Sequence, residues 1–378
     1  MRPASTSTVG APLHTEQMAA LIDARELLQM RLSSQHIEAP TGITPTVAEI
    51  ARQLLAVQAQ DFGQAVWALG LRAPGSTRAD VTAALQSGEV IRSAPIRGTL
   101  HFVAAEDLRW MLSLTAPRMI ASAATRHREL ELDRSTFDLA RDLTTEALAG
   151  GGALSRDEYL ELLEAAGIST TGQRGYHIIW YLAQTGILCW GPPRGTQQAL
   201  VLLDEWVPAT PLLDRDLALR EFVLRYFTGH GPATLKDFVW WSKLTVADAR
   251  IGLDLARDEL TELSYDGASY WVATAEADLA AASRVRPTVH ALPGFDEYLL
   301  GYQDRSLALA PEYATRVVPG KNGVFFAVIV SRGRIVGTWR RTSKAAGITV
   351  TPEPFATLTQ AETAAFARAT KAYAKFFG

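Results

Sequence analysis

Cysteine is almost absent from this chain of 378 residues, which contains only Cys189. A single cysteine excludes an internal disulfide framework and is too few for a thiolate metal site. Stability must then come from a hydrophobic core, and 48% of the residues are hydrophobic. A chain of this length and composition is expected to fold as a globular protein of two to four domains.

Long apolar runs are also missing. The most apolar stretch, VFFAVIV at residues 324–330, is far too short to cross a bilayer and is typical of a buried strand. The N-terminal MRPASTSTVGAPLHTEQ lacks the apolar centre of a signal peptide, so we interpret residues 1–14 as a flexible tail. We expect a cytoplasmic monomer with no membrane partner.

Several motifs of common chemistries are absent. The sequence contains no glycine-rich phosphate loop followed by Lys-Ser/Thr, no nucleophile elbow and no HExxH zinc motif. Its seven histidines are scattered, and an isolated histidine is more often structural than a ligand. We therefore expect neither a metal nor another cofactor.

Charge is unevenly distributed along the chain, although the net charge is only −3. Residues 284–344 carry ten Lys and Arg against four Asp and Glu, whereas residues 201–283 carry seven against fourteen. This asymmetry indicates one basic face that tracks phosphates on an otherwise acidic body. On charge alone, ordinary variation between solvated faces explains it equally well.

The first part of the chain reads as helices followed by a strand. Apolar residues recur at helical spacing over 16–32, and Thr46 with Glu49 forms a capping box before a second helix. A third helix is expected to begin near Thr77, which is spaced with Asp80 as a cap. Residues 96–103 then alternate with a period of two, which predicts a strand. This order is typical of a winged helix, whose wing is a β-hairpin.

The same order recurs twice, which predicts an α+β protein of three tandem winged-helix units followed by a small C-terminal β-barrel-like domain. The second pass has a helix capped by Ser155 and Glu158, and the third has two helices divided near Leu244. After Pro287 the chain becomes rich in β patterns and ends in a helix. The predicted boundaries are a tail at 1–14, winged helices at 15–135, 136–210 and 211–285, and the β domain at 286–378.

Other polar and aromatic groupings have simple structural interpretations. Gln58 and Gln60 stand where the second helix is expected to end, and the pattern alone favours polar residues at a fraying helix end. Trp240 and Trp241 occur in an amphipathic helix, where packing is a better interpretation than base stacking. The stretch FDEYLLGYQDR at 295–305 contains a possible carboxylate pair, but its composition suggests a strand and turn edge.

Five segments, in order, resemble the AlkZ/YcaQ family of bacterial DNA glycosylases, which have three tandem winged helices and a C-terminal β-barrel. They are AVQAQDFGQAVWALGLR, IRGTLHFVAAEDLRWML, GPATLKDFVWWSKLTVADAR, LPGFDEYLLGYQDRS and GRIVGTWRR. They are distributed over residues 54–341, so the resemblance covers most of the chain. In that family the catalytic element is Gln-x-Gln in AlkZ-like members and Gln-x-Asp in YcaQ-like members. Gln58-Ala59-Gln60 matches the first form, and Asp61 lies one place too late for the second.

The resemblance implies a monofunctional glycosylase that removes bulky N7- or N3-alkylated purines from double-stranded DNA, including interstrand crosslinks, in repair or in self-resistance to a genotoxin. Gln58 and Gln60 are then expected to hold the attacking water. Arg97, Thr99 and His101 are expected to share a strand face and to line the lesion pocket or grip phosphate. The expected DNA-contacting residues are Arg305, Arg332, Arg334, Arg340 and Arg341. Two alternatives stay open: a non-catalytic winged-helix DNA-binding protein or transcription regulator, and a resistance protein that binds alkylated DNA or the alkylator without cutting.

Overall fold

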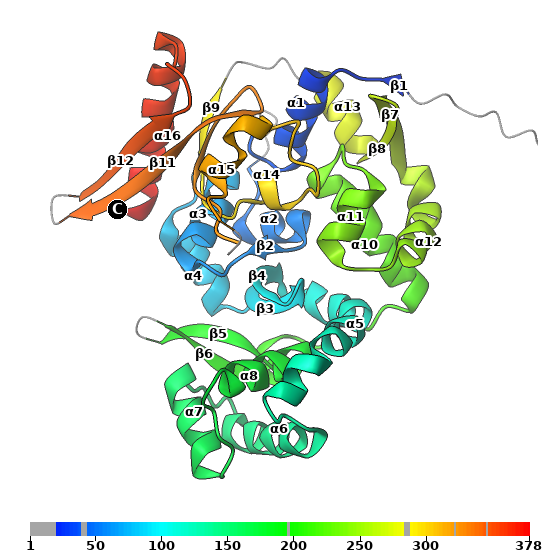
Figure 1. Cartoon of the computed structure of the whole chain (residues 1–378), viewed down its shortest axis with the longest axis vertical. Helices are drawn as coiled ribbons and strands as arrows, with labels where there is room; N and C mark the ends of the chain where they lie inside the picture. Colours follow the sequence, from blue (N-terminus) through cyan, green and yellow to red (C-terminus); the bar gives the residue numbers. More distant parts are fainter. Residues whose placement is uncertain (1–19, 39–43, 195–196, 283–287, 321–322, 345–346) are drawn as a thin grey trace, which may run out of the picture.

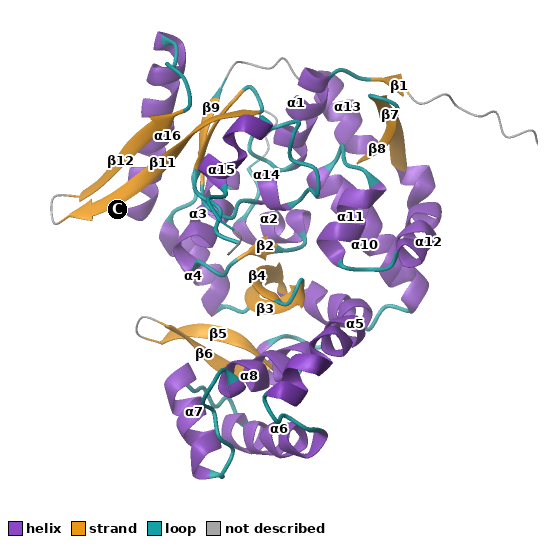
Figure 2. Ribbon diagram, viewed as in Figure 1, coloured by secondary structure: helices purple, strands orange, loops and turns teal. Residues whose placement is uncertain are grey.

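The computed structural model describes residues 20–378 except for 39–43, 195–196, 283–287, 321–322 and 345–346. It is a mixed α+β structure, as expected (Figure 2). Within the described part of the chain, no helix is both long and apolar enough to cross a membrane.

The N-terminal part consists of helices and two short strands, followed by a hairpin and a long helix. Its elements are β1 (Ala20–Leu21), α1 (Ala24–Ser34), α2 (Val47–Leu54), β2 (Val57–Gln58), α3 (Phe62–Arg72), α4 (Arg78–Gln86), β3 (Val90–Ile96), β4 (Thr99–Ala104) and α5 (Leu108–Glu129). The predicted capping boxes at Thr46 and Thr77 both form. The helix predicted over 16–32 is wrong at residues 20–23, because β1 pairs with β7 (Leu260–Tyr265) there; residues 16–19 lie outside the described residues. Asp23 then caps α1.

Two further groups of helices are each followed by a hairpin. The second contains α6 (Arg134–Leu148), α7 (Arg156–Ala165), α8 (Arg174–Gln184), β5 (Leu188–Arg194), β6 (Gln197–Leu202) and α9 (Leu203–Trp206). The third contains α10 (Arg215–His230), α11 (Leu235–Ser242), α12 (Val246–Ala256), β7, β8 (Ala268–Ala273) and α13 (Thr274–Ala282). The expected division near Leu244 is confirmed, because Lys243 ends α11 with φ 63° and Thr245 caps α12. The assignment of the three groups as winged helices stays a prediction.

The first two groups share one sheet. Its strands lie in the order β2-β4-β3-β5-β6, joined where Arg92 pairs with Trp190. Figure 1 shows α6, α7 and α8 as a separate lobe below this sheet. Strand β2 forms the other edge, so the Gln58 segment lies where the first group faces the third group and the C-terminal part.

The C-terminal part is a half-barrel rather than a closed barrel, with an antiparallel sheet in the order β12-β11-β10-β9. Its elements are β9 (Val289–Leu292), α14 (Glu297–Leu300), α15 (Ala314–Val317), β10 (Val328–Ser331), β11 (Arg334–Lys344), β12 (Gly347–Pro354) and α16 (Gln360–Phe377). The strand expected over 324–330 is shorter, because β10 starts only at Val328. The core around Trp67 of α3 continues into this part through Trp339, Tyr373 and Phe376.

A buried ion pair connects the first group to the segment after β9. Arg72 at the end of α3 is fully buried and forms a two-pronged contact with Asp296, at 2.7 and 2.9 Å. Its other N–H groups donate to the Gln35 carbonyl, the Gln35 amide oxygen and the Ala68 carbonyl. All five guanidinium donors are therefore satisfied, which is the condition under which a buried charge is tolerated.

We expect Asp296→Ala to destabilise the protein by about 3–5 kcal/mol, because it leaves the Arg72 charge buried without its partner. The matched control is Glu129→Ala, which breaks an exposed pair with Arg126 and should cost no more than about 0.5 kcal/mol. Urea denaturation of both variants measures the difference. A loss below about 1 kcal/mol for Asp296→Ala would show that the pair does not hold these parts together.

Candidate active site

The Gln58-Ala59-Gln60 segment does not continue a helix. Helix α2 ends at Leu54, and the left-handed backbone of Leu55 (φ 62°) turns the chain away. Gln58 belongs to β2, and Gln60 directly precedes Asp61, which caps α3 through the Gln64 N–H. The expectation of a helix end at the glutamines is therefore wrong. Gln58 therefore lies in the strand, whereas Gln60 lies in the bend that leads into α3.

Gln58 lies directly across from His101 in the β2–β4 pair, so both side chains are on the same face of the sheet. Thr99 precedes His101 by two residues and shares that face. Arg97 does not, because Arg97 and Gly98 form the turn of the β3–β4 hairpin with φ angles of 55° and 69°. The prediction of one strand through 96–103 was wrong, since positive φ at both central residues is typical of a two-residue hairpin turn.

The Arg97 side chain nevertheless returns to this face and contacts both neighbours. Its Nη2 lies 3.2 Å from Gln58 Oε1 and 3.1 Å from His101 Nε2. The guanidinium is almost completely buried, and burial is the main reason why its pKa is lowered, with Glu297 acting in the opposite direction. The structure thus brings Gln58, Arg97 and His101 together, although the route for Arg97 differs from the expected one.

The orientation of each amide is set by a donor that cannot reverse its role. Arg97 donates to Gln58 Oε1, and the Leu100 backbone N–H donates to Gln60 Oε1 at 3.3 Å. Flipping either amide would place an NH₂ group against an N–H donor, which is unfavourable. A carbonyl oxygen has two lone pairs, so each amide keeps one acceptor position and its NH₂ group for another partner. The site therefore offers fixed, neutral donors and acceptors.

His101 is held as a neutral imidazole. Its Nδ1 donates to the Thr99 carbonyl at 2.7 Å, which leaves Nε2 as the acceptor for Arg97. Complete burial, with the Arg97 charge as the next cause, lowers the pKa of His101 to about 3. The ring is thus a positioning element for Arg97 near neutral pH rather than a proton carrier.

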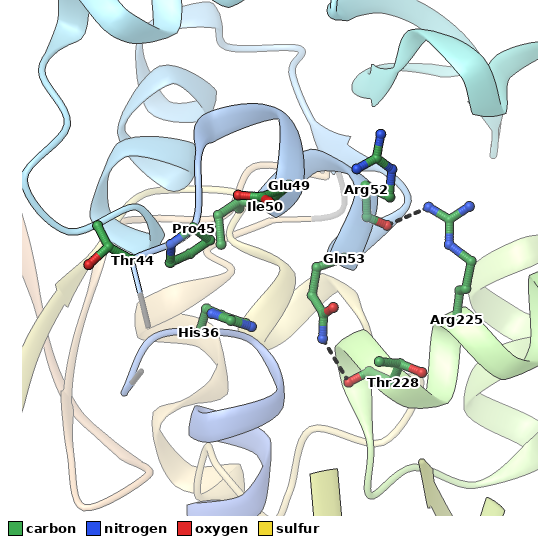
Figure 3. Close-up of a pocket in the computed structure, with 9 residues that line it drawn as sticks. All are labelled: His36, Thr44, Pro45, Glu49, Ile50, Arg52, Gln53, Arg225 and Thr228. Carbon is green, nitrogen blue, oxygen red and sulfur yellow. Dashed lines mark hydrogen bonds between the residues drawn. The ribbon is translucent and has the colours of Figure 1, made fainter. Parts of the chain in front are cut away.

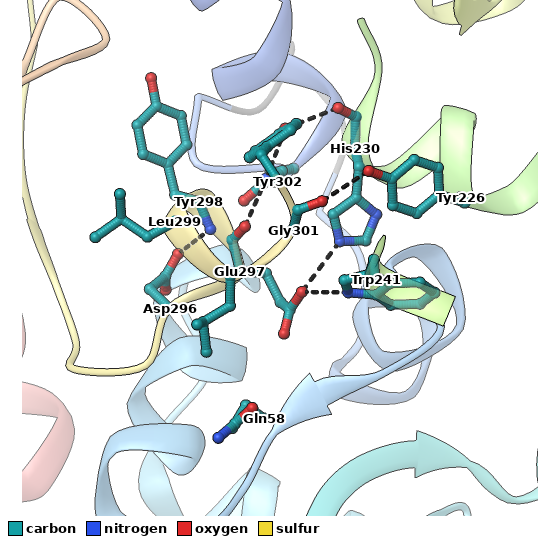
Figure 4. Close-up of polar contacts among 12 residues, drawn as sticks. Gln58, Tyr226, His230, Trp241, Asp296, Glu297, Tyr298, Leu299, Gly301 and Tyr302 are labelled. Carbon is teal, nitrogen blue, oxygen red and sulfur yellow. Dashed lines mark hydrogen bonds and ion pairs between the residues drawn. The ribbon is translucent and has the colours of Figure 1, made fainter. Parts of the chain in front are cut away.

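Glu297 is a buried carboxylate that contacts His230 and Trp241 (Figure 4). Its Oε2 accepts from the indole N–H of Trp241 at 2.9 Å and lies 3.3 Å from His230 Nε2. Its Oε1 is 3.8 Å from Arg97 Nη2. Burial alone would raise the pKa of Glu297, but the His230 hydrogen bond and the Arg97 charge lower it to about 2. The carboxylate is ionised near neutral pH and balances the buried guanidinium.

The composition of the segment 295–305 predicts a strand and turn edge. This prediction is wrong, because the segment contains a short helix. Asp296 caps the short helix α14, and Glu297 begins it. The packing interpretation is confirmed for Trp241, which is fully buried, whereas Trp240 is only half-buried.

Arg92 supports the glutamine segment from β3. Its Nε and Nη2 both donate to the Ala59 carbonyl, at 2.9 and 2.6 Å. Burial lowers the pKa of Arg92 to about 10, partly offset by Asp61. Neither Arg92 nor Glu297 was assigned a role from the sequence. No spacing signal marks Arg92, because its partner lies 33 residues away.

The five arginines expected to contact DNA lie in three places. Arg305 is beside the site, where its guanidinium lies over Trp240 and Phe325. Arg340 and Arg341 line a cavity that is also lined by Asp61, the residue after Gln60, and Arg340 pairs with Glu353. Arg332 and Arg334 are exposed at the β10–β11 turn, where Gly333 packs against Leu28. The turn is therefore supported by α1, and DNA contact stays a prediction for all five.

The pocket of Figure 3 lies elsewhere, between α1, α2 and α10. It is lined by His36, Thr44, Pro45, Glu49, Ile50, Arg52, Gln53, Arg225 and Thr228. None of the predicted site residues is among them. Within the described residues, no three His, Cys, Asp or Glu side chains come together in a way that would hold a metal.

Residues 51–376 match the family described as DNA glycosylase AlkZ-like. The chain belongs to the AlkZ-like DNA glycosylase family. An interstrand DNA cross-link repair glycosylase from Streptomyces sahachiroi is 28% identical over an alignment of 351 residues, and the match covers 87% of this chain and 90% of that protein. The solved structure of Streptomyces sahachiroi DNA glycosylase AlkZ matches with a TM-score of 0.78 at 25% identity, covering 94% of this chain and 97% of that one. The family expected from the sequence is confirmed, and the match includes the Gln58–Gln60 segment of this AlkZ-like protein.

We expect His101 of this AlkZ-like protein to stay neutral, with its proton on Nδ1, from pH 8 down to pH 5. Long-range ¹H–¹⁵N spectra would show unchanging ring shifts in the folded protein and a midpoint near 6.5 in urea. Between about pH 6.5 and 3 the imidazole of His101 binds a proton in the unfolded protein but not in the folded protein. This group therefore lowers the free energy of unfolding as the pH falls through that range. Titration of the folded ring between pH 6 and 7 would contradict the assignment.

Proposed function

We propose that this protein is a monofunctional DNA glycosylase that hydrolyses the N-glycosidic bond of bulky N7- or N3-alkylated purines, including those in interstrand crosslinks. The observation that carries the proposal is the pair of oriented amides at Gln58 and Gln60 beside a buried, charge-balanced Arg97–Glu297 pair. Family membership supports the reaction class, and the name of the Streptomyces sahachiroi relative supports crosslinks as substrates.

The proposed substrates suit a site without a proton-transfer group. A purine alkylated at N7 or N3 already carries a positive charge, so it leaves the sugar as a neutral base and needs no acid. The enzyme then has to orient a water molecule and to stabilise a cationic, oxocarbenium-like sugar. Positioning and fixed dipoles perform both tasks. Such a site should fail on undamaged bases and on uracil, which are poor leaving groups.

Gln58 and Gln60 are the residues proposed to hold the water. Each amide oxygen retains one lone pair on the side away from its fixed donor, and these two acceptors would orient the O–H bonds of one water. Their orientation exists before substrate binds, so no reorganisation is needed during the reaction. Glu297 is not proposed as a base, because it is only 1% exposed and lies behind Arg97.

The remaining expected residues are proposed to hold the lesion and the DNA. Thr99 has a buried hydroxyl for which the described residues provide no partner, which suits a contact with the damaged nucleotide. Arg97 borders the same face. Arg305, Arg332, Arg334, Arg340 and Arg341 are proposed to contact the phosphate backbone or the minor groove.

The alternative functions make a different prediction for one reaction. Incubation with a duplex that carries N7-methylguanine should release free 7-methylguanine and leave an abasic site. A transcription regulator or a binding-only resistance protein would retard the DNA and leave it intact. Release of the base without strand cleavage would also distinguish a monofunctional enzyme from one with lyase activity.

Gln58→Ala and Gln60→Ala should each reduce the single-turnover rate of base release by about tenfold to a thousandfold, the range for one lost transition-state hydrogen bond. Their affinity for lesion DNA should remain near that of the wild type. Gln173→Ala, an exposed glutamine that contacts Arg126 at the start of α8, is the matched control and should react at the wild-type rate. Full activity in either site variant would remove that amide from the mechanism.

The rate should be nearly flat from about pH 5.5 to 8.5, because His101 has a pKa of about 3, Glu297 has one of about 2, and the amides do not titrate. Glu276 is another group that titrates in this range and must be controlled for. Burial raises its pKa to about 7, although its hydrogen bond with Gln53 acts in the opposite direction. An inflection that survives in Glu276→Gln but disappears in His101→Gln would make the histidine the base.

A further inference from the structure

A group of cations surrounds the half-buried indole of Trp240. The charged centres of Arg97, Lys243 and Arg305 lie 5.6, 5.4 and 5.1 Å from the centre of the ring. These residues come from the β3–β4 turn, the end of α11 and the segment after α14. We call these four residues the Trp240 cluster. Three regions far apart in the sequence therefore bring their positive charges to one place.

The cluster contains almost no compensating negative charge. Among the described residues, the only ion pair that its cations form joins Arg97 to Glu297, at 3.8 Å. The Lys243 ammonium has no carboxylate partner there, and the Arg305 Nε donates to the Leu299 carbonyl. Other buried or half-buried arginines, such as Arg72 and Arg225, are instead neutralised by an ion pair with an aspartate.

The cations also repel one another. Burial lowers the pKa of Lys243, and the charges of Arg97 and of Arg118 in α5 lower it further. Burial and Arg97 likewise lower the pKa of Arg305, with Asp237 acting in the opposite direction. Each of these shifts means that a charge is less favourable here than in water. An anion bound at the cluster would remove that cost.

Trp240 explains how the cations are held without being neutralised. The face of an indole attracts cations through its quadrupole but has no net charge. A carboxylate at the same position would hold the cations equally well but would cancel their attraction for an anion. The neighbouring Trp241 has a different role, since it is buried and donates to Glu297.

We propose that the Trp240 cluster binds a backbone phosphate of the DNA strand, next to the nucleotide presented to Gln58. This inference rests on the proposed function. Arg97 connects the two places, because the Nη2 that donates to Gln58 belongs to the same guanidinium that lies near Trp240. A phosphate on the cluster would fix the register of the strand relative to the glutamines. It would act on every sequence, because phosphates are the same at each step.

The test compares Lys243→Gln with Arg250→Gln, which removes one charge from the exposed surface of α12. Fluorescence anisotropy with undamaged duplex between 50 and 200 mM KCl gives the slope of log affinity against log salt. Loss of one phosphate contact should make the slope of Lys243→Gln shallower by about 0.9. Arg250→Gln should keep the wild-type slope.

Trp240→Leu tests the aromatic part, and its melting temperature establishes that it is folded. It should also weaken binding, because the cations lose their common partner while keeping their charges. A wild-type slope in Lys243→Gln together with wild-type affinity in Trp240→Leu, with base release intact, would overturn the phosphate site alone. Failure of the wild-type protein to bind duplex at 50 mM KCl or to release base would overturn the proposed function itself.

Discussion

Two adjacent buried carboxylates, Asp296 and Glu297, hold the centre of this molecule together. Asp296 forms the ion pair with Arg72 of α3, and Glu297 contacts Trp241 and His230 of the third helical group. Because neighbouring residues at a helix start point in different directions, this one short segment connects α3 with the third helical group. Glu297 also faces Arg97, which orients Gln58. The position of the glutamine amide thus depends on contacts made more than 200 residues away.

Features determined by nearby residues were predicted well from the sequence. The capping boxes at Thr46, Thr77 and Ser155 all form, since a side chain and an N–H three residues away suffice to define a helix start. The end of α2 was not predictable in this way. It depends on the left-handed conformation of Leu55, a residue type that gives no signal for such a turn.

The sequence identified the glutamine motif of the candidate site but not the residues that hold it in place. Gln58 and Gln60 were named through the family resemblance, because the pattern alone favoured a frayed helix. Arg92, Glu297 and Trp240 obtain their roles from partners distant in sequence, and a single sequence does not reveal such pairs. Even the correct grouping of Arg97 with His101 came from a wrong local structure, since a turn rather than a strand brings the guanidinium back.

The charge distribution shows why net charge is a poor guide to what a surface binds. Residues 201–283 are acidic overall, yet they contribute Trp240 and Lys243 to the most poorly compensated cations described beside the site. Conversely, Arg340 comes from the basic region 284–344 but is paired with Glu353. An anion responds to the potential at the place where it binds, and this potential falls within about 10 Å at moderate salt. At the proposed phosphate site, cations held by an uncharged ring matter more than the net charge of the segments that supply them.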